Sequence, residues 1–166
     1  MKKIFLSVLV IILVIALSSA IDKERYYYHN SDYSPIFMSR EMLEQSVLYV
    51  QGAREVKNTG KVYYRAPYIY MNERYKGVHV INVANPENPV NEGFILAPGC
   101  IDMAVKDHIL YLDNAVDLVS FDLNGKTVTN RIRNVFPEPA APGYSYNDFH
   151  DRPENYILVE WRKKEP

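Results

Sequence analysis

The chain has 166 residues, of which 48% are hydrophobic and 13% aromatic, with 14 tyrosines and a formal net charge of −1 at pH 7. This balance, with its only basic run at Arg162-Lys163-Lys164, excludes a surface that tracks nucleic-acid phosphates. The single cysteine, Cys100, excludes an internal disulfide, and its apolar neighbours predict a small, buried, inert thiol.

The first twenty residues have the pattern of a secretory signal. Lys2 and Lys3 supply a positive start, residues 4–17 form a nearly continuous apolar run, and Ser18-Ser19-Ala20 offers small residues for cleavage. Fourteen residues are short for a hydrocarbon layer about 30 Å thick, which favours a cleaved signal over a retained N-terminal anchor. A lipoprotein signal would need Cys in place of Ala20, so lipid cannot attach there. We expect export to the periplasm, the cell envelope or the outside, with membrane contact only if residues 1–20 are retained.

Residues 21–60 show no sustained period and are expected to form an irregular leader with one short helix. Ser39 can cap this helix, which is expected to run through Met42, Leu43 and Val47, and Glu41 would favour its first turn.

From residue 61 the strand signals become regular and divide into two units of four strands. The expected strands are 61–65, 68–73, 77–83 and 90–97 in the first unit, and 101–105, 108–113, 116–123 and 127–133 in the second. Asn124-Gly125 favours a two-residue type I′ hairpin, which would pair Leu118 with Ile132. Residues 134–147, rich in proline, are expected to form a loop before a last strand over 156–161.

The two units are copies of one another. Ile69-Tyr70-Met71-Asn72 returns as Leu110-Tyr111-Leu112-Asp113, and residues 78–83 return as 118–123 after a slightly shorter loop. A period of roughly 40 residues, built from short apolar runs, is typical of the four-stranded blades of β-propellers. The third strand of each unit is apolar at nearly every position, which indicates cover on both faces.

These observations predict an all-β protein with two four-stranded propeller-type blades, that is a partial β-propeller, and a short N-terminal helix. A closed propeller needs at least about four blades. The chain is therefore a shortened relative of a larger propeller, a partial ring finished by another copy or a partner, or two packed sheets.

One segment carries a family resemblance. Residues 77–90, GVHVINVANPENPV, resemble the repeat of the LVIVD-repeat proteins of bacterial and archaeal envelopes, with 78–82 and 118–122 at the naming pentapeptide. Residues 98–105 also resemble the segment that opens a repeat in this family. The resemblance covers roughly residues 36–136 and implies a propeller-like exported domain, over residues 61–166, with no catalytic activity to carry over.

Candidate metal ligands lie in one short stretch. Asp148 and His150 would point the same way on an extended segment, with Asp151 beside them. Ligand spacing alone is unspecific, so solvated loop side chains are the preferred interpretation, and no cofactor is expected. Asp102 is an unusual polar residue on an apolar strand, for which we expect burial with backbone N–H partners rather than a role as a catalytic acid.

Aromatic residues outside the two units are the candidate ligand-binding residues, because exposed rings present an apolar face with a polar tip. They are Tyr26, Tyr27, Tyr28, Tyr144, Tyr146 and Trp161. A glycan or a peptide would suit them, although half-buried tyrosines need no ligand.

The expected function is therefore a non-catalytic binding or scaffold module of the bacterial cell envelope. One alternative is a metal-assisted hydrolase that uses the Asp148, His150 and Asp151 loop. Another is a subunit that completes a larger propeller with a protein partner or with its own copies, through open blade edges. No nucleic-acid partner is expected.

Overall fold

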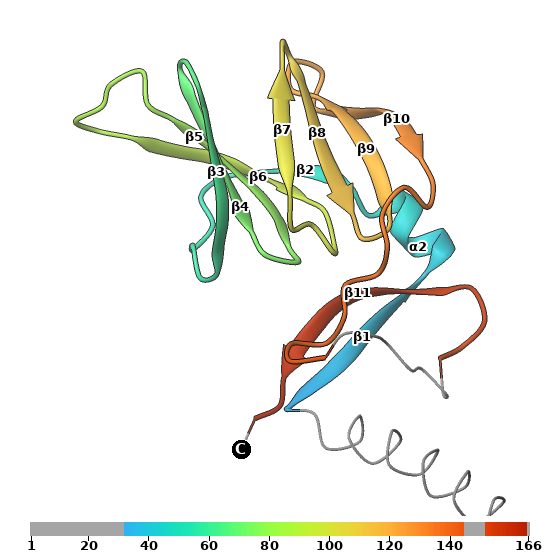
Figure 1. Ribbon diagram of the computed structural model, residues 1–166. Coiled ribbons are helices and arrows are strands. Elements are labelled where there is room, and N and C mark those ends of the chain that lie inside the picture. Colours follow the sequence, from blue (N-terminus) through green and yellow to red (C-terminus); the bar gives the residue numbers. More distant parts are fainter. Residues whose placement is uncertain (1–31, 145–151, 166) are drawn as a thin grey trace, which may run out of the picture.

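The computed structural model describes residues 32–144 and 152–165, which form an all-β fold of three antiparallel sheets (Figure 1). The first sheet contains β2 (Leu48–Gln51), β6 (Val90–Leu96), β5 (Gly77–Asn82), β4 (Tyr68–Glu73) and β3 (Thr59–Arg65), in that spatial order. The second contains β10 (Thr127–Ile132), β9 (Asp117–Asp122), β8 (Ile109–Asn114) and β7 (Met103–Lys106). The third is a ribbon of β1 (Tyr33–Ser39) and β11 (Tyr156–Lys163), and α2 (Arg40–Gln45) follows β1 directly.

Each repeated unit folds as a four-stranded meander, because short turns join consecutive strands that run antiparallel. The strands lie close to their expected positions, and β4 has the expected bounds of Tyr68 and Glu73. Leu118 pairs with Ile132, which confirms the expected contact between β9 and β10.

The predicted type I′ turn at Asn124-Gly125 is wrong. Four residues, from Leu123 to Lys126, connect the paired residues Asp122 and Thr127, and among these four Lys126 has positive φ, at 53°. The side chain of Asp122 accepts a hydrogen bond from the Asn124 N–H at 2.9 Å, which stabilises this wider loop.

The described part of the predicted irregular leader, residues 32–60, contains β1, α2, β2 and the first two residues of β3. The Ser39 hydroxyl accepts a hydrogen bond from the Met42 N–H at 3.3 Å, and α2 ends at Gln45, before Val47. β1 pairs with β11 from Tyr33 opposite Lys163 to Ser39 opposite Tyr156. β2 adds a fifth strand to the first sheet by pairing with β6.

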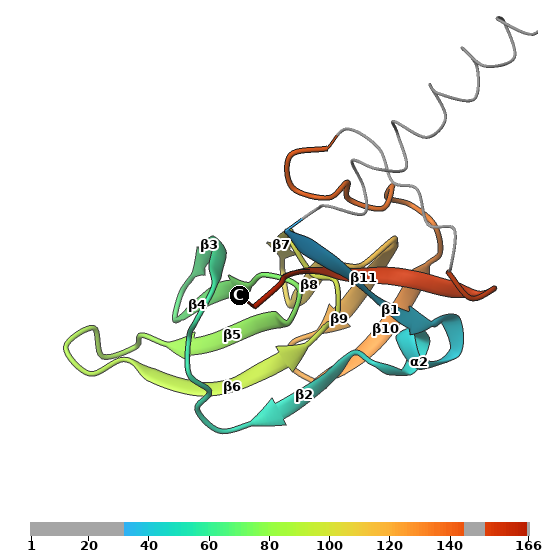
Figure 2. The same cartoon turned by 90° about the horizontal axis from the view of Figure 1, so that it is seen from below.

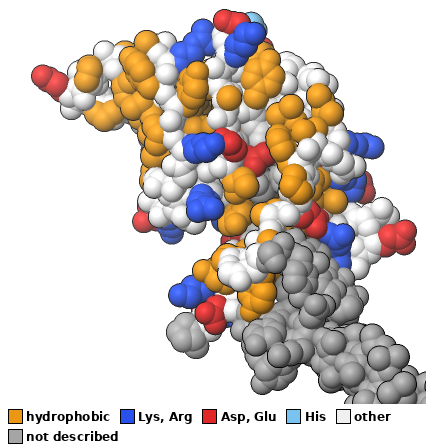
Figure 3. Space-filling model, viewed as in Figure 1, with side chains coloured by type: hydrophobic (Ala, Val, Ile, Leu, Met, Phe, Trp, Pro, Cys, Tyr) orange, Lys and Arg blue, Asp and Glu red, His pale blue; other side chains and the backbone are white. Residues whose placement is uncertain are grey.

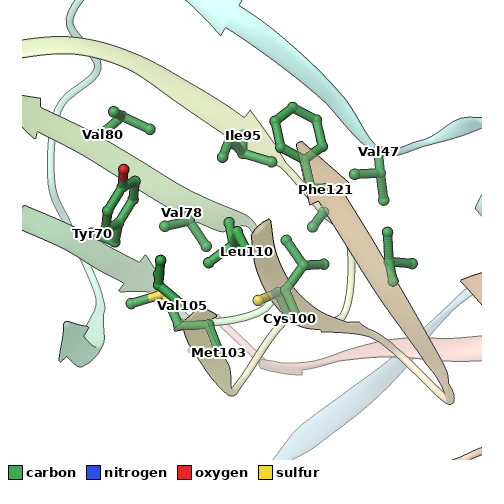
Figure 4. Packing of buried hydrophobic residues seen from close by; sticks show 13 residues of the cluster. Val47, Tyr70, Val78, Val80, Ile95, Cys100, Met103, Val105, Leu110 and Phe121 are labelled. Carbon is green, nitrogen blue, oxygen red and sulfur yellow. The ribbon is translucent and has the colours of Figure 1, made fainter. Parts of the chain in front are cut away.

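The main core lies between the first and second sheets (Figure 4). Tyr70, Val78 and Val80 from the first sheet meet Leu110 and Phe121 from the second, and all five side chains are buried. Because side chains alternate along a strand, each sheet uses one face for this contact and turns the other face away. The two repeated units therefore pack side by side and bury each other's surface.

The β1 and β11 ribbon lies across one end of the sheets (Figure 2). Buried Leu43, Ala115 and Val159 join α2, the second sheet and β11 in a second apolar cluster. Lys76 donates to Glu160 at 2.6 Å and ties the first sheet to the ribbon. In the part of the chain that the structure describes, no helix is long and apolar enough to cross a membrane.

Candidate binding cleft

A cleft of about 250 Å³ opens between the first two sheets, at the end away from the ribbon. The turns between β3 and β4, between β7 and β8 and between β9 and β10 meet there, because antiparallel strands bring every second turn to the same end. The residues that line the cleft are Tyr49, Arg65, Ala66, Pro67, Tyr68, Tyr70, Val80, Glu92, Ile95, Asp107, His108, Phe121, Leu123, Asn124 and Lys126.

Three tyrosines, together with buried Phe121, form the aromatic part of the cleft. The rings of Tyr68 and Tyr70 lie 6.1 Å apart and are tilted by 41°. The Tyr49 hydroxyl donates to the Glu92 carbonyl at 3.2 Å, which fixes that ring at the β2 edge of the first sheet. Burial raises the pKa of Tyr70, with a further contribution from Tyr68, so its hydroxyl keeps its proton at neutral pH.

Two cations border these rings. The Lys126 ammonium lies 4.1 Å from the centroid of the Tyr49 ring, a distance suited to a cation–π contact. Arg65 lies at the end of β3, at the edge of the same cleft. Within residues 32–144 and 152–165, neither cation forms an ion pair with a carboxylate.

Of the aromatic residues proposed from the sequence, Trp161 and Tyr144 lie in the described part of the chain and do not line the cleft. Trp161 is 4% exposed and donates from Nε1 to the Pro139 carbonyl at 2.8 Å, so it is a core residue of the ribbon strand β11. Tyr144 packs against the same cluster. Four others, Tyr26, Tyr27, Tyr28 and Tyr146, lie outside the described residues.

The candidate metal ligands Asp148, His150 and Asp151 also lie outside the described residues. Among residues 32–144 and 152–165, no group of three His, Cys, Asp or Glu side chains could hold a metal ion.

Asp102 does not have the buried role that its position predicted. It is exposed and forms an ion pair with Lys61 at 2.5 Å. Asp113 takes that role instead, because its Oδ1 accepts hydrogen bonds from the N–H groups of Ile101 and Asp102, each at 2.9 Å. Burial raises the pKa of Asp113.

Cys100 is buried, as predicted. Burial, together with the nearby Asp113 carboxylate, raises the pKa of the thiol well above its ordinary value, which leaves it protonated and unreactive.

A buried carboxylate, Asp117, holds the second sheet to α2. Arg40 donates to both of its oxygens at 2.8 and 2.7 Å, Arg131 donates at 2.8 Å, and the Asn134 N–H donates at 3.1 Å. Burial alone would raise the pKa of Asp117, but these hydrogen bonds and the Arg40 charge lower it. This network positions α2 and β10 and does not face the cleft.

The cleft combines aromatic faces with both signs of charge, an arrangement that suits recognition of a small polar ligand. The sequence prediction missed its residues because tyrosines inside the repeated strands read as ordinary half-buried strand residues. The signal was present, since Tyr68 and Tyr70 are two residues apart on one strand face, beside the turn at Pro67.

Comparison of the chain with protein-family models, with curated proteins and with solved structures finds no match.

Proposed function

We propose that the chain is a non-catalytic exported binding module of the bacterial cell envelope, built from two propeller-type blades, which holds a saccharide between them. The single observation that carries the binding role is the cleft lined by the half-buried rings of Tyr49 and Tyr68, above buried Tyr70, with Arg65 and Lys126 on its border.

The chemistry of the cleft favours a saccharide as the ligand. Tyrosine rings pack against the C–H face of a sugar ring, while their hydroxyls and the neighbouring charged groups bind its hydroxyls. Arg65 and Lys126 would also bind a carboxylate on an acidic sugar.

The propeller-type arrangement is supported by the repeat of one strand pattern in both units, the two meanders and the shared core between them. Export is supported by the signal pattern of residues 1–20.

Export is tested by expression in a bacterial host, followed by intact-mass measurement of the protein in the envelope fraction. Removal of residues 1–20 is the expected result, and recovery of the unprocessed chain in the cytoplasm would contradict it.

The binding role is tested by titrating the full chain with neutral and acidic oligosaccharides, and with short peptides as the competing ligand class, monitored by tyrosine fluorescence. Tyr68→Ala and Lys126→Ala should each weaken saccharide binding about tenfold, the loss expected when a stacked ring or a charged contact is removed. Tyr156→Ala is the matched control, because this tyrosine is 38% exposed on β11 and does not line the cleft. Binding of peptides alone, or equal losses in the control, would contradict the proposal.

A further inference from the structure

We propose that copies of this chain associate head to tail, with the outward face of the first sheet of one copy packed on the outward face of the second sheet of the next. The inference is separate from the proposed function, because the cleft opens at the end of the sheets and these surfaces are their flat sides.

The outward face of the first sheet has an exposed apolar part over β3, β4 and the end of β5. Its other part is covered by the chain before β3, where Arg54 lies 4.4 Å from the Phe94 ring and Asn91 donates to the Arg54 carbonyl at 3.1 Å. Val62 pairs with Met71 and Tyr64 with Ile69 across β3 and β4, and Ile69 pairs with Ile81 on β5, so these five side chains share one face. Val62 is 59% exposed and Tyr64 is 63% exposed. Figure 3 shows hydrophobic side chains gathered over this sheet.

The outward face of the second sheet is also apolar and is hollowed into a groove of about 470 Å³. Tyr111 from β8 and Leu118 from β9 form its floor, and Phe136 and Pro137 from the loop after β10 form one wall. Tyr111 is 36% exposed, and Ile132, which pairs with Leu118, is 51% exposed. Exposed apolar surface of this kind marks an interaction site.

The repeat indicates what covers these faces. Within one copy, Leu110, Leu112 and Phe121 of the second sheet pack against Tyr70 and Val78 of the first.

The outward faces carry the equivalents of those same two surfaces. When the two units are aligned on their repeated segments, Ile69, Met71 and Ile81 correspond to Leu110, Leu112 and Phe121. Tyr111 and Leu118 of the groove correspond in the same way to Tyr70 and Val78. A second copy can therefore repeat between molecules, over the exposed β3 and β4 part of this face, the contact that each molecule already makes inside itself.

The two contacting surfaces differ from each other, so the association is heterologous. Such contacts build a ring if the rotation closes and an open chain if it does not. Each copy would supply two units to the assembly, and its neighbours would cover the two outward faces that it cannot cover itself.

Sedimentation velocity of the full chain over a range of concentrations tests the proposal. The wild type should show concentration-dependent species larger than a monomer. Tyr64→Lys and Tyr111→Lys each place a charge on one exposed face and should weaken association at least about tenfold. Met42→Lys is the matched control, because Met42 is 62% exposed on α2 and lies on neither face, and it should behave as the wild type.

An equimolar mixture of the two face variants makes the test specific. Each variant keeps one intact face, so the mixture should form a dimer and nothing larger. Val62→Lys and Ile132→Lys provide a second pair if either first variant fails to give the native circular dichroism spectrum. A wild type that remains monomeric, variants that keep the wild-type distribution, or a mixture that stays monomeric or grows beyond dimers would each overturn the proposal. Oligomers held together by the apolar residues 4–17 would persist in every variant and would count against it.

Discussion

Each repeated unit has a buried carboxylate that accepts two backbone N–H groups just before its first strand, but the pKa values of the two carboxylates shift in opposite directions. In the first unit Glu73 accepts hydrogen bonds from the N–H groups of Lys57 and Asn58, just before β3. In the second unit Asp113 accepts the N–H groups of Ile101 and Asp102, just before β7. Both carboxylates are buried, at 5% and 7% exposed.

The side chains next to Glu73 and Asp113 account for the opposite shifts of their pKa values. Burial raises the pKa of both groups, but His79 lies 3.1 Å from Glu73 and, with the two N–H donors, brings the net pKa of Glu73 below its ordinary value. Asp113 has the Cys100 thiol in place of a histidine, and the effect of burial prevails, so its pKa is raised. The two carboxylates do not occupy equivalent positions of the repeat, because Asp113 aligns with Asn72 and Glu73 with Asn114. They accept similar pairs of backbone N–H groups, and their different neighbours decide which form of each carboxyl group is stable.

The largest difference between the units is Asp117, whose equivalent in the first unit is Gly77. Asp117→Asn should lower the free energy of unfolding by about 3–5 kcal/mol, because it leaves Arg40 and Arg131 without their shared carboxylate. Guanidinium unfolding monitored by circular dichroism measures the loss. Arg133→Gln, which removes a surface pair with Glu44, should cost no more than about 1 kcal/mol. Equal losses in the two variants would show that Asp117 does not anchor the second sheet.

Replacing each carboxylate by its uncharged amide tests the contrast between Glu73 and Asp113 directly. Glu73→Gln should lose about 1–3 kcal/mol at pH 7, since His79 then faces an amide in a buried place. Asp113→Asn should lose less, because the amide oxygen can still accept both N–H groups and the raised pKa shows that the charged form is disfavoured there. Urea unfolding of the two variants under identical conditions measures the difference. A larger loss in Asp113→Asn would contradict the assignment of opposite electrostatics.

Most strands of the fold could be predicted from the sequence, because local signals specify them. Apolar runs separated by turn residues predicted the eight strands of the two units, and the repeat predicted their side-by-side packing. β1 was missed because Pro35 interrupts its pattern and its partner β11 lies more than a hundred residues away. β2 was missed because it is short and largely exposed.

The cleft could not be predicted from the sequence, because it depends on tertiary contacts. The cleft exists only because turns from both units meet at one end, and no local pattern specifies which turns meet. The sequence also predicted the wrong buried carboxylate, Asp102 in place of Asp113, because no local pattern specifies which of the two the fold buries. Both lie near strand ends, and only the tertiary fold shows that Asp113 is buried while Asp102 meets Lys61 at the surface.

The opposite pKa shifts also predict opposite pH dependences. Glu73 binds more protons in the unfolded chain between its lowered folded pKa and its ordinary value of 4.5, so its stabilising contribution is lost as the pH falls through that window. Asp113 binds more protons in the folded chain above its ordinary value of 3.8, so its contribution is lost as the pH rises towards its folded pKa. As the pH falls from 7 to 3, the stability advantage of the wild type should shrink relative to Glu73→Gln and grow relative to Asp113→Asn. Unfolding free energies at each pH measure both trends, whose slope is at most about 1.4 kcal/mol per pH unit for one proton. Trends of the same sign would refute the contrast.

The smallest expected effect concerns the turn between the second and third strands of each unit. This turn holds a non-glycine residue at positive φ in both copies, Tyr75 at 63° and Ala115 at 57°. Ala115→Gly removes a left-handed strain of about 1 kcal/mol and also a buried methyl group worth about 0.8 kcal/mol, so the net change in stability should lie near zero. Ala104→Gly makes the same chemical change on the extended strand β7 and should cost about 0.5–1 kcal/mol. Thermal unfolding of both variants measures the contrast. If Ala115→Gly loses more than Ala104→Gly, packing against Leu43 and Val159 outweighs backbone strain at this turn.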